Sequence, residues 1–152
     1  MQKQIKSVHE FHAAFGLGIN TNPVGDLGKH KNRLRYNLMK EENEEYLEAV
    51  TNNDIVEIAD ALGDMLYILF GTIIEHGLQD KMEAVFDEIQ RSNMSKLDYD
   101  GKPIYRHDGK VLKGPRYFKP NFEEMTNANI LDQIQLYIVI IKLTSLLLKM
   151  KI

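Results

Sequence analysis

The chain has no cysteine and no tryptophan, and only four of its 152 residues are proline. Without cysteine there is no disulfide, no thiolate metal site and no cysteine nucleophile, and such a composition suits the cytosol. Residues 1–15 hold no apolar run of signal-peptide length. Nor does any run reach the roughly 18 apolar residues of a membrane helix. We therefore expect a cytoplasmic protein without stable membrane insertion.

A second absence is local: residues 41–64 contain no lysine or arginine, yet they contain nine acidic residues. Residues 96–119 show the opposite bias, with seven basic residues and three acidic ones. The whole chain carries a net charge of −3, which argues against a nucleic-acid partner. Acidic and basic blocks in one chain of single-domain length suggest a metal site facing an anion site.

Apolar periodicity predicts four helices in the first two thirds of the chain. Asp54 is a candidate N-cap of the third helix and Gly77 a candidate C-cap. Residues 18–30 read as a loop, and the apolar stripe of Phe11, Phe15, Leu34 and Leu38 is expected in the core. The expected helices cover residues 3–16, 32–50, 55–76 and 80–93.

After the fourth helix the pattern changes. Residues 97–120 hold two Asp-Gly turns, which predict a small hairpin or an ordered loop. Residues 129–152 are apolar and read as a helix, expected at a dimer interface, with a membrane-surface contact or a disordered tail as alternatives. We divide the chain into a domain of residues 1–122 and a C-terminal apolar helical extension of residues 123–152.

The third helix carries the sharpest signal. The only charges of residues 55–74 are Glu57, Asp60 and Asp64, which fall within an arc of about 60° on a helix. Burial of three carboxylates without a cation would cost several kcal/mol per group. This arc therefore faces either water or a positive charge.

The second helix supplies further acids. Glu41, Glu42 and Glu45 span an arc of about 100°, on the stripe that also holds Leu38 and Ala49. The connection between the two helices is so short that they must pack antiparallel, which brings both acidic groups together. Oxygen ligands without cysteine or histidine suit Mg²⁺ or Mn²⁺.

Plainer interpretations exist for single acids. Glu57 could complete a capping box with Asp54, and Glu44 and Glu48 are expected to be solvated surface charges. Each acid alone would favour such an interpretation. Together, on a helix with no other charge, they favour the metal site.

The pattern Glu41-Glu42-x-x-Glu45 followed by Glu57-x-x-Asp60 resembles the EExxE…ExxD signature of the MazG-like all-α nucleoside triphosphate pyrophosphohydrolases. The later run RSNMSKLDYDGKPIYRHDGKVLKGPRYFKP is similar to the tail of the phosphoribosyl-ATP pyrophosphohydrolase-like branch. The resemblance covers about residues 8–122. It implies an all-α antiparallel helical bundle with a helical-hairpin core, completed to four helices in a homodimer or a dimer of dimers. The apolar girth of the third helix agrees, since the other helices of one chain are too few to cover it.

The resemblance also implies residue roles. Glu42, Glu45, Glu57 and Asp60 match the Mg²⁺ ligands. Glu41, with Glu42, is a catalytic candidate that either assists a second metal or orients the attacking water. Water would attack the α-phosphorus of a nucleoside triphosphate and release pyrophosphate. The substrate-binding candidates are Asp64, Arg91, Asn93, Lys96, Arg106 and Lys113.

Other functions remain open. Phosphoribosyl-ATP hydrolysis is one alternative, although the resemblance favours house-cleaning of non-standard or deoxynucleotides such as dUTP or dCTP. A non-catalytic nucleotide-binding protein is a second. A di-iron bundle is disfavoured, because the central helices lack the Glu-x-x-His pairs of that class. His9 and His12 have ligand-compatible spacing but no surrounding carboxylates, and His12 could instead reach a base or phosphate.

Overall fold

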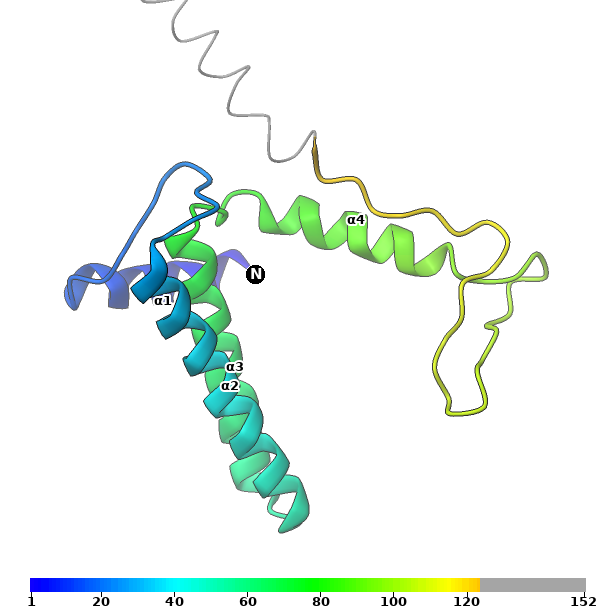
Figure 1. The fold of residues 1–152 in the computed structure, drawn as a ribbon, viewed down its shortest axis with the longest axis horizontal. Coiled ribbons are helices and arrows are strands. Elements are labelled where there is room, and N and C mark those ends of the chain that lie inside the picture. The colour runs from blue at the N-terminus through cyan, green and yellow to red at the C-terminus, as the bar shows by residue number, and fades with distance from the viewer. Residues whose placement is uncertain (124–152) are drawn as a thin grey trace, which may run out of the picture. The chain divides into compact units, whose positions relative to one another are not determined.

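The computed structural model describes residues 1–123, which contain four helices and no strand (Figure 1). This confirms the all-α class. Helix α1 spans Gln2–Ala14, α2 spans Lys29–Thr51, α3 spans Ile55–Glu75 and α4 spans Met82–Met94. The predicted C-terminal helix at residues 129–152 lies outside the described residues.

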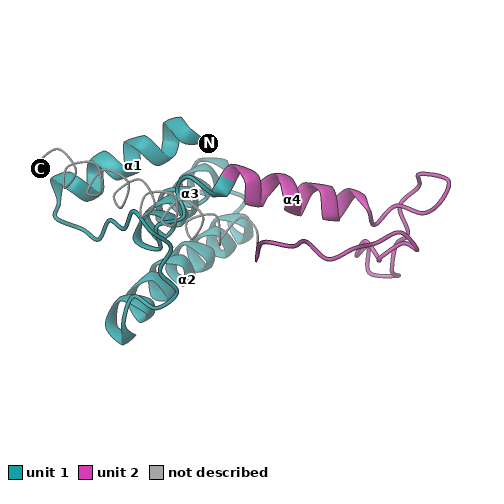
Figure 2. Ribbon diagram, turned by 90° about the horizontal axis from the view of Figure 1, so that it is seen from above, with its two compact units in different colours: residues 1–82 teal, residues 83–152 magenta. Residues whose placement is uncertain are grey.

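The chain forms two compact units, Met1–Met82 and Glu83–Ile152 (Figure 2). The first unit holds α1, α2 and α3, and the second begins within α4. The domain boundary that the sequence placed at residue 122 stays a prediction. Within residues 1–123, no helix combines the length and hydropathy needed to cross a bilayer.

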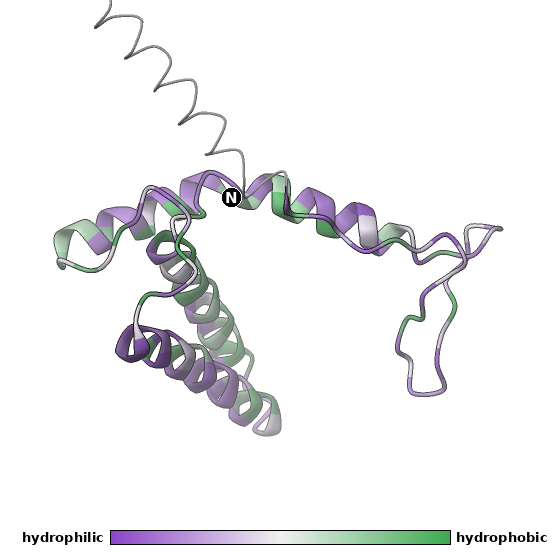
Figure 3. Cartoon of the chain, turned by 45° about the horizontal axis from the view of Figure 1, so that its top comes forward, coloured by the Kyte–Doolittle hydropathy of each residue, from purple (hydrophilic) through white to green (hydrophobic). Residues whose placement is uncertain are grey.

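Helices α2 and α3 pack along each other as an antiparallel hairpin. Three residues connect them, and Asp54 caps α3 as predicted, its side chain accepting hydrogen bonds from Val56 N and Glu57 N. Helix α3 ends at Glu75, and Gly77 follows with φ 67°, a conformation that glycine adopts without strain. The two helices differ in character, since α2 is mostly hydrophilic and α3 mostly hydrophobic (Figure 3).

Helix α2 begins three residues earlier than expected. Asn32, the expected first residue, folds its side chain back onto the entry loop: its Nδ2 donates to Asp26 Oδ1, and its Oδ1 accepts from Leu27 N. Gly28, with φ 88°, turns the chain into the helix. Local side-chain bonding of this kind is a common alternative to helix initiation by asparagine.

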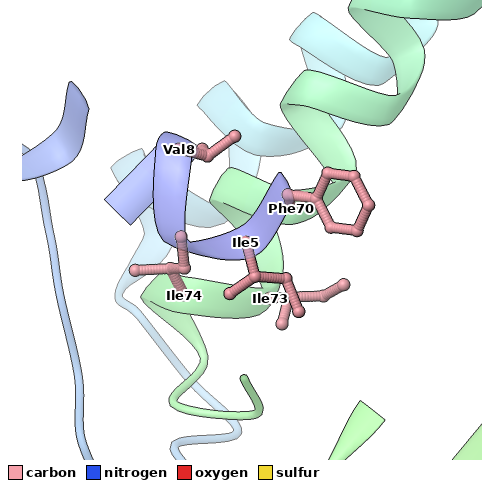
Figure 4. Packing of buried hydrophobic residues seen from close by; sticks show 5 residues of the cluster. All are labelled: Ile5, Val8, Phe70, Ile73 and Ile74. Carbon is pink, nitrogen blue, oxygen red and sulfur yellow. The ribbon is translucent and has the colours of Figure 1, made fainter. Parts of the chain in front are cut away.

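The core of the first unit lies between α1 and the C-terminal half of α3. It consists of Ile5, Val8, Phe70, Ile73 and Ile74, of which Ile74 is fully buried (Figure 4). The predicted core stripe was wrong for three of its four residues, because Phe11, Phe15 and Leu34 are 37%, 68% and 45% exposed, whereas Leu38 is half-buried. Periodicity placed them on common helix faces, but no element of residues 1–123 buries those faces, although the Phe11 ring lies 5.5 Å from that of Tyr67 in α3.

The second unit is held by side chains of α4 and of Ser95, the residue after it, that bind the backbone of residues 118–121. Ser92 Oγ donates to Phe118 O, Phe118 N donates to Ser95 Oγ, and Asn121 N donates to Glu88 Oε1. Residues 97–120 form an ordered loop whose two arms meet in one antiparallel bridge, between Tyr105 and Val111. Both Asp-Gly turns are present, with φ 78° at Gly101 and 85° at Gly109.

Candidate active site

The linked end of the α2–α3 hairpin carries the acidic groups that the sequence singled out. A cleft of about 380 Å³ opens there between the two helices. Glu45 and Glu48 line it from α2, and Glu57 and Asp60 line it from α3, with Asp54 at the N-terminus of α3. The acids of the two helices therefore converge, as the short connection required.

Glu42 is the most enclosed of the predicted site acids. It is half-buried, and its Oε2 is buried without a hydrogen-bond partner. Partial burial raises the pKa of Glu42, and the negative charges of Glu45, Asp64, Glu41 and Asp60 raise it further, in that order. Acids of both helices thus act on one carboxyl group. A buried anion in such surroundings is stabilised by a cation.

The plain interpretation of Glu57 as a capping-box residue is not what the structure shows. In a capping box the Glu57 side chain would bind Asp54 N, but that amide donates to Ala49 O instead. The carboxylate of Glu57 therefore lies on the cleft. Glu44 is a surface charge as expected, paired with Lys40 at 3.1 Å, whereas Glu48 is exposed but lines the cleft.

The donor set fits Mg²⁺ in chemistry, because every acid is a hard oxygen ligand. Within residues 1–123, no three His, Asp or Glu side chains stand close enough together to form a ready-made coordination shell. Mg²⁺ does not need one, since it is usually bound by one or two carboxylates together with waters and substrate phosphates.

The other substrate-binding candidates lie in the second unit, most of them in contacts of their own. Lys96 Nζ donates to Asn93 Oδ1 at 2.6 Å, which brings these two candidates together. Arg91 pairs with Glu88 at 2.7 Å and lies 4.5 Å from the centre of the Phe118 ring. Arg106 pairs with Asp108, and Lys113 Nζ lies 4.4 Å from the centre of the Tyr117 ring.

Sequence reasoning missed a buried charged group at the other end of the hairpin. Arg35 of α2 and Glu75 of α3 are 7% and 5% exposed, and their charged atoms lie 3.8 Å apart. His12 of α1, 2% exposed, belongs to the same group and holds Gly18 O at 2.8 Å through Nδ1. One signal was available, because Arg35 lies seven residues before Glu42 and hence on the same helix face.

The phosphoribosyl-ATP pyrophosphohydrolase family model matches residues 8–93, more than half of the chain, and the chain belongs to that family, within the MazG-like superfamily. The resemblance drawn from the acidic motifs is thereby confirmed.

Two individual proteins are also similar. An uncharacterized protein, L479, of Acanthamoeba polyphaga mimivirus is 32% identical over 95 residues. This match covers 60% of the chain but only 38% of the viral protein, so the chain spans well under half of that relative. The crystal structure of a "putative NTP pyrophosphohydrolase" from Exiguobacterium sp. 255-15 is 24% identical, with a TM-score of 0.43, and the match covers 87% of this chain and 96% of that one.

Proposed function

We propose that this chain is a Mg²⁺-dependent nucleoside triphosphate pyrophosphohydrolase, which converts a ribo- or deoxyribonucleoside triphosphate and water into the monophosphate and pyrophosphate. One observation carries the proposal: the acids of α2 and α3 gather around Glu42, whose buried oxygen lacks a partner. Family membership supports pyrophosphohydrolase chemistry in general.

Glu42, Glu45, Glu57 and Asp60 would hold the ion, and Mn²⁺ could substitute for Mg²⁺ because it accepts the same oxygen ligands. When bound, the ion neutralises phosphate charge and lowers the pKa of water in its shell. Asp60, Glu57 and Glu45 already line one cleft, so they share access to the same ligand.

Glu41 and Glu42 would receive the proton of the attacking water. The oxygen of this water forms a bond to the α-phosphorus. At the same time the bond from the α-phosphorus to the oxygen that bridges the α- and β-phosphates breaks, and pyrophosphate leaves. Burial, followed by the neighbouring acids, raises the pKa of Glu42 in the metal-free protein, and a raised pKa favours proton uptake by a carboxylate.

Asp64 and the second-unit candidates Arg91, Asn93, Lys96, Arg106 and Lys113 would contact the substrate. Cationic side chains suit the phosphates that the ion does not reach. Lys96 and Asn93 are the strongest of these candidates, because both belong to the SNMSK run that resembles the family. The hydrogen bond between them holds the two side chains close together.

The test is pyrophosphate release from a panel of nucleoside triphosphates with Mg²⁺, with and without excess EDTA. The panel includes dUTP, dCTP, non-canonical bases and phosphoribosyl-ATP. We expect turnover of at least one triphosphate, abolished by the chelator. Turnover in excess EDTA would refute the metal mechanism, and turnover of phosphoribosyl-ATP alone would favour the family's named activity. Nucleotide binding without any pyrophosphate release would identify a non-catalytic binding protein.

The proposed enzyme acts in the cytoplasm as a homodimer or a dimer of dimers. The support is the outer face of α3, where Ile55, Val56, Leu62 and Leu66 are 45% to 74% exposed. Ile55, Leu62 and Leu66 share one stripe of the helix and Val56 lies beside it, and exposed apolar side chains gathered in this way are typical of an interface. A second copy would complete a four-helix core.

A further inference from the structure

The inner face of α2 offers little apolar surface to hold the helix in place. Of its residues, only Arg35, Leu38, Glu42 and Ala49 are buried or half-buried. They lie three, four and seven residues apart and so form one stripe along the helix. Two of the four are charged, and a single leucine and a small alanine specify rotation and depth of packing poorly.

Arg35 makes directional contacts with α3 that can fix the rotation and depth of packing of α2. Its Nε donates to Thr72 Oγ1 at 2.9 Å, and its Nη2 donates to Ile68 O. Its Nη1 lies 3.8 Å from Glu75 Oε1. The planar guanidinium thus reaches three successive groups along α3, and such a fork fixes both distance and orientation.

The surroundings of Arg35 are closed on every side that the structure describes. A Cβ placed on Gly71 would lie 2.9 Å from Arg35 Nη2 and 2.7 Å from His12 Nε2. Glu75 is held in turn, since Lys31 Nζ lies 3.6 Å from its Oε2 and Asn20 Nδ2 donates to its backbone oxygen. The hydrogen bonds and the ion pair of the guanidinium all go to α3, so they act on the packing of the two helices.

We propose that Arg35 is a positioning residue, which fixes the rotation and register of α2 against α3 and so aims the site carboxylates at one another. The three-residue link fastens one end of the hairpin, and Arg35 fastens the other. Glu42 lies between these two points, about 10 Å along the helix from Arg35. The consequence for catalysis rests on the proposed function, whereas the effect on helix register does not.

The test compares Arg35→Lys and Thr72→Val with Arg33→Lys as a matched control. Arg33 is an exposed arginine of the same helix that stacks over Tyr36. Mn²⁺ alone is the metal probe, titrated by electron paramagnetic resonance, and pyrophosphate release gives kcat and KM. We expect the first two variants to weaken Mn²⁺ binding by about tenfold or more, as loss of a ligand's supporting contacts does, and to lower kcat more than they raise KM.

Helix register is measured separately, with spin labels on Glu44→Cys and Gly63→Cys in the full-length chain. The chain has no native cysteine, Glu44 is exposed, and a Cβ at Gly63 meets nothing within 4 Å. The labelled chain is diluted with excess unlabelled chain, so that only distances within one chain are seen. We expect a narrow distance distribution in the parent and in Arg33→Lys, and a shifted or broadened one in Arg35→Lys and Thr72→Val.

An unchanged distance and unchanged Mn²⁺ affinity in both test variants, with only a lower melting temperature, would overturn the proposal and leave Arg35 a merely stabilising residue. Thr72→Val keeps every charge, so it decides the question should Arg35→Lys fail to fold. If the parent neither binds Mn²⁺ nor releases pyrophosphate, the proposed function fails, and the spin-label distances still decide whether Arg35 sets the register.

Discussion

Glu42 stands apart from the other five predicted site acids because it alone is half-buried, while the rest are exposed. Burial, which removes water from the carboxylate, and then the negative charges around it favour its protonated form, so the pKa of Glu42 is raised in the folded protein. This residue therefore links the stability of the metal-free protein to pH.

The expected pH dependence has a definite sign. An acid with a raised folded pKa binds its proton more tightly in the folded than in the unfolded state, so stability falls as pH rises from the ordinary pKa of 4.5 through the raised pKa. We expect the melting temperature of metal-free Glu42→Gln to exceed that of the parent by a margin that grows as the pH rises above the ordinary pKa of 4.5. Parallel melting curves across this range would contradict the assignment.

The difference in melting temperature between Glu42→Gln and the parent separates the contribution of Glu42 from that of four other acids with shifted pKa values. Hydrogen bonds lower the pKa of Asp26, Glu88, Asp100 and Asp108, which makes the protein lose stability as pH falls. These four groups are present in both proteins, so their contribution cancels in the comparison.

Glu45 and Asp60 are expected to be required for turnover but not for folding. Asp60→Asn and Glu45→Gln keep the side-chain shape and remove one charge from a self-repelling cluster. We expect pyrophosphate release to fall by about 10²-fold or more, because a ligand is lost, while the metal-free melting temperature equals or exceeds that of the parent. Glu44→Gln is the control, since Glu44 pairs with Lys40 on the surface. Near-normal turnover with a clear loss of stability would make these acids structural.

At the scale of the element, α3 packs against two other helices, α1 and α2, and does so in different ways. Its C-terminal half packs against α1 through Phe70, Ile73 and Ile74, and it approaches α2 closely where Gly71 leaves room for His12 and Arg35. Gly63, which lies between Asp60 and Asp64 in the sequence of α3, has open space where a Cβ would be added. A side chain larger than that of glycine would therefore clash at Gly71 but not at Gly63.

This contrast predicts opposite effects of one substitution. Gly71→Ala would press a methyl group against two buried, hydrogen-bonded side chains, and we expect it to lower the free energy of unfolding by about 1–3 kcal/mol. Gly63→Ala gains helix propensity without a clash and should raise the free energy by up to about 1 kcal/mol. Urea denaturation of both variants measures the difference. Equal effects at the two positions would mean that the packing around Gly71 is looser than described.

At the scale of the whole molecule, the exposed apolar face of α3 is the surface on which the proposed dimer would form. Leu66 lies in this face and is 54% exposed. We expect the parent to show two or four times the 17.6 kDa mass of one chain in light scattering, and Leu66→Glu to shift it towards the monomer. Val111→Glu, at an exposed residue of the loop in the second unit, is the control and should leave the mass unchanged. A monomeric parent with full turnover would contradict the proposed dimer.

The features predicted well from sequence depend on local interactions. The cap at Asp54 and the convergence of the acids follow from spacing along one helix and from a short link, whereas the C-cap of α3 is His76, one residue before the predicted Gly77. The exposed stripe at Phe11 and Leu34 was misplaced because periodicity identifies a face but not what covers it. Arg35 was missed because its partners lie 33 to 40 residues away in sequence, and its position on the helix face of Glu42 does not reveal those partners.

The three-residue link between α2 and α3 also has a consequence for the order of folding. Closing this hairpin loses little chain entropy, whereas docking Ile5 of α1 beside Ile74 closes a loop of nearly 70 residues. We expect the hairpin to form in the folding transition state and α1 to dock afterwards. In stopped-flow experiments, Ala61→Gly should mainly slow refolding, while Val8→Ala should mainly speed unfolding. The carboxylates of the site would then be brought together before the chain completes its core.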